Sequence, residues 1–315
     1  MHAPVATDNL KEETEMYHST EYHREFWNAA RGRSVTYSHI NDGKNTANGS
    51  YRLPAESDTK FVAARKKENI FRQIATGVEA NKGDNVVWAY DNEPSATWLN
   101  QNNTSGFFKN TEVFEKHKLE CQILGASILM PEDFCNDASF DVEAHILKDF
   151  GRSIGRAEEA AFISGDGVDA PHGFLKDAVT GHSTSDITYD DVIRLFFSLD
   201  KEYCRNAVWI MNDETALKLR TLKDASGNYL WNHSDNTIMG KPVYISNYMP
   251  GEAVGAKPIA FGDFSYYWII DRMPFTMRRL NELYITKGQI CYLGYEYLDA
   301  KLIRPDAIHV IQIGE

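Results

Sequence analysis

Residues 140–167 read FDVEAHILKDFGRSIGRAEEAAFISGDG, the most regular stretch of the 315-residue chain. Apolar residues recur in it at steps of three and four, which predicts a long α-helix with one apolar stripe. Asp137 or Ser139 is expected to cap its start, and Gly165 and Gly167 are expected to end it in the left-handed conformation that glycine tolerates. The predicted stripe comprises Phe140, Ala144, Leu147, Phe150, Ile154, Ala157 and Ala161.

The opposite side of this helix is charged. Its pairs Asp149–Arg152 and Arg156–Glu159 stand at helix-neighbour spacing, so we expect ion pairs along the helix. Glu158 and Glu159 are interpreted as part of a solvated face rather than as a catalytic pair of carboxylates.

A G-x-S-x-G pattern, typical of serine hydrolases, lies inside the same helix at residues 151–155. It would make Ser153 the nucleophile, with His145 or His172 as its base. That chemistry needs a strand, a strained turn and then a helix, which together push the hydroxyl into a cleft. A serine in the middle of a helix therefore indicates a chance match.

Two β-type runs precede the helix and predict a hairpin. Residues 86–90 are the first predicted strand, residues 112–124 are the second, and the polar residues 92–110 form the tip. One face of the second run is predicted to carry Val113, His117, Leu119, Cys121 and Ile123. An isolated hairpin is marginally stable in water, so we expect this one to lie on a second subunit.

The first 40 residues are interpreted as an N-terminal arm. Residues 17–30 predict one helix, which Gly32 ends. Residues 41–58 are polar and lack a hydrophobic period, which indicates a linker or extended arm. A short helix is expected at about residues 59–74.

From residue 186 onward, predicted helices alternate with predicted strands. The helices are expected at 186–205 and 213–222, and the strands at 208–211, 243–246 and 259–261. β-type runs dominate from residue 275 to residue 313. The chain is therefore predicted to have an α+β fold.

Composition restricts the classes of function. The chain has 43% hydrophobic residues and a net charge of −12, so a sizeable core is expected and binding of nucleic acid through a broad basic face is disfavoured. Its four cysteines are widely spaced, its histidines are scattered and it lacks a phosphate-loop motif, which predicts no catalytic residue, no cofactor and no metal site. Because it has neither a secretory signal nor a bilayer-length apolar run, we expect a soluble cytosolic protein with no membrane segment.

A series of short motifs resembles the major capsid proteins of tailed bacteriophages, which have the Hong Kong 97-like fold. No single motif is specific for this family, but the occurrence of all of them in one order along residues 49–313 is. They are GSYRLP at 49–54, ENIFRQIA at 68–75, ATW at 96–98, KL at 118–119, SILMPED at 127–133, EEAAFISGDG at 158–167, PHGFL at 171–175, MND at 211–213, LKDASGNYL at 222–230, GKPV at 240–243, GDF at 262–264 and RPDA at 304–307.

The resemblance implies a division of the chain into the parts of that fold. An N-terminal arm would occupy residues 1–56, the start of a peripheral domain 57–84, and an extended β-hairpin loop 85–124. Residues 125–185 would continue the peripheral domain with its long spine helix. Residues 186–274 would form a central axial α/β domain, and residues 275–315 the C-terminal strands of the peripheral domain.

By the same resemblance, the chain is expected to be a structural capsid protein of a phage or prophage and not an enzyme. Its copies would self-assemble into hexamers and pentamers of an icosahedral shell, which encloses DNA without sequence-specific binding. The expected partners are a separate scaffolding protein, a portal protein and, as a further candidate, a maturation protease. Assembly would take place in the bacterial cytoplasm, and residues 17–33 would be the remnant of a scaffolding segment or part of the arm.

Some members of this family join neighbouring subunits by an isopeptide bond between a hairpin lysine and an asparagine, assisted by a glutamate. The hairpin offers Lys109, Lys116 and Lys118. Gly288 and Tyr295 align with the asparagine and the glutamate, and Glu296 is one residue out of phase. Covalent cross-linking is therefore not expected.

Three alternatives remain open. An encapsulin-type nanocompartment shell protein has the same fold and would package an enzyme instead of a genome. A serine hydrolase built on Ser153 is disfavoured by the helical position of that serine. A nucleic-acid-binding module is disfavoured by the acidic charge.

Overall fold

The computed structural model describes residues 17–33, 51–79, 86–90, 114–118, 120–137, 139–223, 226–227, 229, 231 and 236–314. They form an α+β protein that divides into two compact units. Unit 1 consists of the described parts of Met1–Ile74, Gln122–Pro171 and Asp271–Leu298. Unit 2 consists of the described parts of Ala75–Cys121, His172–Ile270 and Asp299–Glu315.

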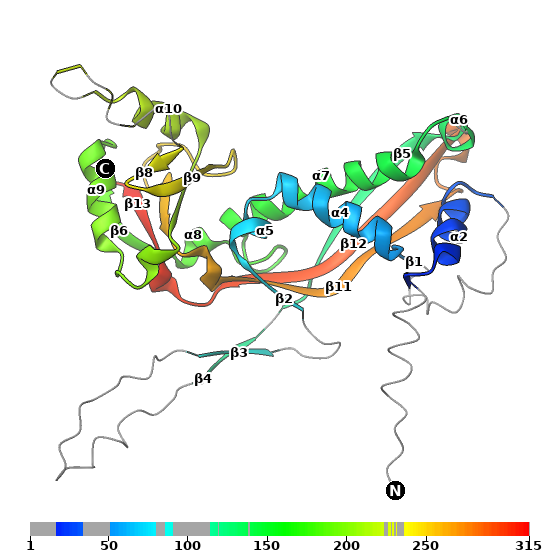
Figure 1. Cartoon of the computed structure of the whole chain (residues 1–315), viewed down its shortest axis with the longest axis horizontal. Helices are drawn as coiled ribbons and strands as arrows, with labels where there is room; N and C mark the ends of the chain where they lie inside the picture. Colours follow the sequence, from blue (N-terminus) through cyan, green and yellow to red (C-terminus); the bar gives the residue numbers. More distant parts are fainter. Residues whose placement is uncertain are drawn as a thin grey trace, which may run out of the picture. The chain divides into compact units, whose positions relative to one another are not determined.

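Unit 1 is built on a sheet with the strand order β1-β11-β12-β5 (Figure 1). Its strands are β1 (Tyr51–Arg52), β11 (Tyr267–Leu280), β12 (Gln289–Leu302) and β5 (Gln122–Pro131), and the long strands β11 and β12 contribute residues to both units. β12 and β5 pair antiparallel, from Gln289 opposite Pro131 to Leu298 opposite Gln122. The helices of this unit are α2 (Thr20–Ala30), α4 (Ala55–Glu68), α5 (Phe71–Ile74), α6 (Glu132–Asn136), α7 (Val142–Ser164) and η4 (Ile285–Lys287).

The predicted long helix is confirmed as α7, but both of its ends differ from expectation. Asp141 caps the start by accepting from the Ala144 N–H at 3.0 Å, whereas the Asp137 carboxylate accepts from Ser139. Gly165 follows the helix with a φ of −55°, and only Gly167 is left-handed, with a φ of +78°. Gly165 is required for space instead, because a Cβ there would overlap the Pro171 carbonyl.

The buried side of α7 is rotated from the predicted stripe. Leu147, Phe150 and Ile154 are buried as expected, but Ala144 and Ala157 are exposed. The buried residues that the prediction missed are Val142, Ile146, Phe162, Ile163 and the carboxylates Glu158 and Glu159. The predicted apolar stripe therefore left Glu158 and Glu159 on the solvent-exposed side of the helix, whereas both are buried.

Helix α4 lies along α7, and two glycines of α7 make this approach possible (Figure 1). A Cβ at Gly151 would lie 2.6 Å from the Ala64 Cβ, and a Cβ at Gly155 would lie 2.8 Å from the Arg65 carbonyl oxygen. Because real Cβ atoms do not approach so closely, larger residues would force the helices apart. These are the two glycines of the G-x-S-x-G pattern.

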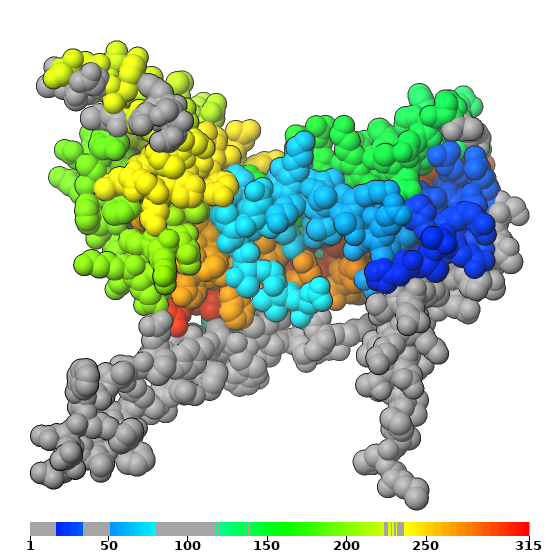
Figure 2. All heavy atoms as spheres, viewed as in Figure 1, coloured from blue at the N-terminus to red at the C-terminus, as the bar shows by residue number. Residues whose placement is uncertain are grey.

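Helix α2 packs into the core of unit 1, although these residues were predicted to belong to an arm. Tyr22, Phe26 and Trp27 are buried in the same apolar cluster as Phe150 and Ile154 of α7. The Tyr22 hydroxyl donates to the Arg52 carbonyl at 2.7 Å. In Figure 2, α2 (dark blue) lies beside α4 on the same face of the unit.

Unit 2 contains a six-stranded sheet with the order β6-β13-β10-β7-β9-β8. β10 runs antiparallel to β7 and β13, whereas β13–β6 and β7–β9 are parallel pairs. The strands are β6 (Val179–Thr184), β7 (Val208–Met211), β8 (Thr237–Ile238), β9 (Lys241–Ile245), β10 (Ile259–Gly262) and β13 (Ile308–Ile313). The helices are α8 (Phe174–Asp177), α9 (Tyr189–Ser198), η2 (Tyr203–Arg205), α10 (Asp213–Thr221), η3 (Phe264–Tyr266) and η5 (Pro305–Ala307).

The predicted helix over 186–205 is interrupted. α9 ends at Ser198 because Leu199 is extended, and the chain resumes helical geometry only in η2. Residues 299–315 were expected with peripheral strands, but β13 is an inner strand of the unit 2 sheet, between β6 and β10. Its residues Ile308 and Val310 are fully buried, which explains the near-continuous apolar run there.

The predicted hairpin is present in part. β3 (Val86–Tyr90) pairs antiparallel with β4 (Phe114–Lys118), and β2 (Thr76–Glu79) pairs with β11. The predicted second strand over 112–124 is wrong as one element, since β4 ends at Lys118 and β5 begins at Gln122. His117 is buried but Cys121 and Ile123 are exposed, whereas Val113, Leu119 and the tip at 92–110 lie outside the described residues.

Candidate functional site

The hydrolase candidates do not form a catalytic arrangement. Ser153 and His145 are both exposed on α7, and their eight-residue separation places them about 12 Å apart along the helix axis. His172 belongs to unit 2, where its Nδ1 lies 2.9 Å from the Asp177 carboxylate. The glycines of the pattern are explained by the packing of α4 on α7.

The most unusual polar feature of the molecule is a buried ionic network in unit 1. Its core joins α4, α5, α7 and β12 through Arg65, Arg72, Glu158 and Glu296, whose side chains are 10%, 9%, 0% and 3% exposed. The Arg65 Nη1 donates to Glu296 Oε2 at 2.7 Å and lies 3.6 Å from Glu158 Oε1. Buried charges of this kind are tolerated only when they are paired.

Arg72 is the second cation of the network. It donates from Nε to Glu158 Oε2 at 3.1 Å, from Nη2 to Glu158 Oε1, and from Nη1 and Nη2 to Asp271 at 2.6 and 2.8 Å. Burial alone lowers the pKa of Arg72, but the charges of Glu158 and Asp271 outweigh it and raise the pKa above the ordinary value. Arg72 is therefore a fixed cation between α7 and β11.

The glutamates of α7 also hold the chain between α4 and α5. The Asn69 Nδ2 donates to Glu158 Oε2 at 2.9 Å, and the Ile70 N–H donates to Glu159 Oε2 at 2.9 Å. The expectation of a solvated Glu158–Glu159 face is therefore wrong. Both carboxylates are buried because donors from α4, α5 and the residues between them surround them.

The arginines of the predicted ion pairs along α7 have partners on a second helix. Arg152 and Arg156 both turn to Glu68 of α4, at 3.6 and 3.0 Å, and Asp149 pairs with His145 at 3.4 Å. The rule for helix neighbours applies to isolated helices, and here the second helix offers better-placed partners.

A second polar node attaches α2 to the rest of unit 1. The Glu143 Oε1 accepts from the Ser57 hydroxyl and the Lys60 ammonium, both at 3.1 Å, and lies 3.3 Å from His23 Nε2. Ser57 in turn accepts from the Trp27 indole N–H at 3.0 Å. Elements α2, α4 and α7 thus meet at one carboxylate.

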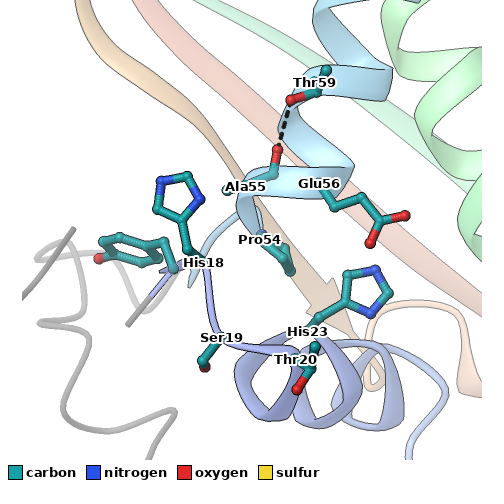
Figure 3. A pocket seen from close by; sticks show the side chains of 9 residues that line it. His18, Ser19, Thr20, His23, Pro54, Ala55, Glu56 and Thr59 are labelled. Atoms are coloured by element: carbon teal, nitrogen blue, oxygen red, sulfur yellow. Dashed lines mark hydrogen bonds between the residues drawn. The ribbon is translucent and has the colours of Figure 1, made fainter. Parts of the chain in front are cut away.

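An open pocket of about 320 Å³ lies between the starts of α2 and α4 (Figure 3). Glu56 on its rim pairs with Lys60 at 2.9 Å, and the Thr59 hydroxyl donates to the Ala55 carbonyl at 2.9 Å. Its lining consists of Tyr17, His18, Ser19, Thr20, His23, Pro54, Ala55, Glu56 and Thr59. Nothing in this lining assembles the ligand set of a metal.

A smaller cavity of about 130 Å³ borders the ionic network. Ala157 and Ala161, both predicted to face the core, line this cavity together with Leu298 and Pro171. The Gln122 side chain also lines it, and its buried Oε1 has no hydrogen-bond partner among the described residues. The alanines keep this space open beside Glu158.

The positions considered for cross-linking are distributed as follows. Lys118 is exposed near Glu120, at 3.8 Å, whereas Lys109 and the side chain of Lys116 lie outside the described residues. Gly288 follows η4 in the left-handed conformation, and Tyr295 is buried beside Tyr297. Glu296 is committed to Arg65 inside the ionic network.

Among the described residues, no group of three His, Cys, Asp or Glu side chains could hold a metal ion. Within the same part of the chain, every helix is too short or too polar to cross a bilayer.

A family model described as the phage capsid family matches residues 49–313. The chain belongs to the phage capsid family. It is therefore a structural protein and not an enzyme, as the ordered motifs predicted. The curated "Major capsid protein" of Klebsiella oxytoca phage phiKO2 is 22% identical over 237 residues. That match covers 69% of this chain and 54% of the relative, so the chain spans about half of the relative's length.

Solved structures of capsids have the same fold. The capsid of a native GTA particle, computed with C5 symmetry, is 28% identical with a TM-score of 0.64, and the match covers 78% of this chain and 90% of that chain. A chain from Gordonia phage Cozz is 13% identical with a TM-score of 0.56, and the match covers 79% of this chain and 87% of that chain. These matches favour the phage capsid over the encapsulin alternative.

Sequence reasoning missed the ionic network that characterises unit 1. Glu158 and Glu159 are consecutive, so a helix with one apolar stripe assigns at least one of them to solvent. The sequence did contain two cations that could have indicated the network, Arg65 in α4 and Arg72 in α5. Their partners Asp271 and Glu296 are about 200 residues away in sequence, at separations of 199 and 231.

Proposed function

We propose that this chain is a major capsid protein whose copies assemble into hexamers and pentamers of an icosahedral phage head. The observation that carries the proposal is the family match over residues 49–313. The parts would be those of the Hong Kong 97-like fold, with α7 as the spine of a peripheral domain in unit 1 and unit 2 containing the axial domain. The β3–β4 hairpin would lie over a neighbouring subunit, and the arm would run beneath it.

An exposed strand supports contact between copies. β5 pairs only with β12 among the described residues, and residues 122–131 carry no charged side chain. Ile123 and Leu129, on one face of β5, are 63% and 47% exposed. Proteins protect such edges with charges, prolines or covering elements, since an open apolar edge promotes aggregation. In a shell, a second copy would cover it.

The remaining partners follow from the family. A scaffolding protein would direct assembly, a portal protein would occupy one vertex, and a maturation protease is a further candidate. DNA would be enclosed without being gripped, which suits a chain with a net charge of −12. The shell would not be cross-linked, because Gly288 and Tyr295 lack the side chains that the reaction requires.

The test is negative-stain electron microscopy with size exclusion on the purified protein, alone and with a co-expressed scaffolding partner. We expect rings, tubes or closed shells. A double variant, Ile123→Glu with Leu129→Glu, should stay folded but lose assembly. The matched control Val168→Glu should assemble normally, because Val168 is 74% exposed on a loop. A monomer under both conditions would overturn the proposal, and shells that hold a cargo enzyme instead of DNA would support the encapsulin alternative.

A further inference from the structure

The ionic network of unit 1 holds more carboxylates than cations. Arg65 and Arg72 supply two positive charges, whereas Glu158, Glu296 and Asp271 supply three potential negative charges. Two further carboxyl groups lie nearby: Glu159, which accepts from the Ile70 N–H, and Asp58 of α4, which interacts electrostatically with Arg65 and Asp271. The neighbouring strand β5, which pairs with β12 at Leu124 opposite Glu296, contributes no charge. An uncompensated charge at this depth is strongly unfavourable.

The excess negative charge is located at Glu296. Its Oε2 accepts from Arg65, but its buried Oε1 has no hydrogen-bond partner among the described residues. Glu158 crowds the same nitrogen of Arg65, with its Oε1 3.6 Å away. Two carboxylates that share one site do not both ionise, because each raises the free energy of the other's charged form. A proton at Glu296 lowers the excess negative charge and satisfies the orphaned oxygen.

We propose that Glu296 is protonated at neutral pH in the folded protein and donates its O–H to Glu158, so that this proton joins β12 to α7. Burial raises the pKa of Glu296 well above its ordinary value, and Glu158 raises it further, while Arg65 and Arg72 lower it. The proton leaves Arg65 and Arg72 paired with the carboxylates of Glu158 and Asp271. The inference concerns the subunit itself and does not depend on the proposed assembly.

The proton shared between β12 and α7 makes the stability of unit 1 depend on pH. A carboxyl group with a raised pKa binds a proton in the folded state that the unfolded state has released, so stability falls as pH rises from the ordinary glutamate pKa to the folded-state pKa. Within that window, one bound proton changes the folding equilibrium constant by roughly tenfold per pH unit. The added negative charge would repel Glu158 and loosen α7 from β12.

The test compares the wild-type subunit with Glu296→Gln, whose amide mimics the protonated acid and can donate to Glu158. Urea unfolding is measured between pH 5 and pH 9. We expect the ratio of the variant's folding constant to the wild-type constant to rise by up to roughly tenfold per pH unit across the window. Parallel pH profiles for the two proteins would overturn the proposal.

A second readout and a matched control separate the proton from a general packing effect. Difference infrared spectra at pH 7 should show a protonated-carboxyl band in the wild type that is missing in Glu296→Gln. The control Glu68→Gln removes a carboxylate that pairs with Arg152 and Arg156 at the surface of the same helix pair. It should leave both the band and the pH slope unchanged, and a wild-type spectrum without the band would refute the assignment.

Discussion

The two units bury polar groups in opposite ways. In unit 1, a network of charges connects five elements, and its partners are separated by up to 231 residues in sequence. In unit 2, the core contains an aromatic stack of Trp209, Phe261 and Phe196. The buried carboxylate of Asp191 is held by Thr188, three residues away, and by His182. Unit 1 therefore depends on long-range charge balance, and unit 2 on packing and local capping.

The largest expected effect comes from the aromatic core of unit 2. Trp209 is fully buried, stacks on Phe261 at 4.1 Å and donates to the Ile238 carbonyl at 3.1 Å. Trp209→Ala should reduce the free energy of unfolding by about 4 kcal/mol, because it leaves a cavity and an orphaned carbonyl. Chemical denaturation followed by circular dichroism measures the loss.

The control for this prediction is Phe197→Ala on α9. Phe197 is 73% exposed, so its removal should change the free energy of unfolding by less than about 0.5 kcal/mol. Similar losses for the two variants would mean that unit 2 does not depend on this stack.

The next largest loss of stability is expected when the charge network of unit 1 is broken. Arg72→Met preserves most of the apolar stem but leaves Glu158 and Asp271 without their shared cation. We expect a loss of about 3 kcal/mol, because breaking a buried pair strands the remaining charge. Arg152→Met, which removes a half-exposed partner of Glu68, should cost less than about 1 kcal/mol. If Arg72→Met were as mild as Arg152→Met, the contrast between the units would fail.

The same contrast explains what could be predicted from the sequence. Elements with a regular period, such as α7, β7 and α10, follow from local pattern, and so does the α+β class. The ordered motifs also identified the phage capsid family correctly. These features depend on neighbours along the chain, as the cap that Thr188 and Asp191 form in unit 2 does.

The features that the sequence did not predict depend on distant partners. The Glu158 and Glu159 side chains are buried only because α4 and α5 bring donors to them, and Gly151 is glycine because Ala64 packs against it. Helix α2 was assigned to the N-terminal arm, yet its apolar face completes the core of unit 1. A period reveals which side is apolar, but it does not reveal a buried charge whose counterion is elsewhere.

The smallest expected effect concerns Asp191, the counterpart of Glu296 in unit 2. Burial by itself raises the pKa of Asp191, but the hydrogen bonds from Thr188 and His182 outweigh burial and hold the pKa below its ordinary value. Its stabilising contribution is therefore present above the ordinary aspartate pKa, near 4, and is lost as the pH falls through the lower folded-state pKa. The Thr188 N–H and hydroxyl donate to Asp191 Oδ2 at 2.9 and 2.6 Å.

Asp191→Asn should cost about 1 kcal/mol at pH 7, the usual value of a helix cap, and should flatten the loss of stability below pH 4. Urea unfolding from pH 3 to pH 7 measures this slope, with the exposed neighbour Asp190→Asn as the control. The two carboxyl variants should thus act on opposite sides of about pH 4, Asp191→Asn below it and Glu296→Gln above it. If Asp191→Asn changed the pH dependence between pH 5 and pH 7 instead, the cap formed by Thr188 and Asp191 would not act independently of the long-range charges, and the distinction between the units would have to be abandoned.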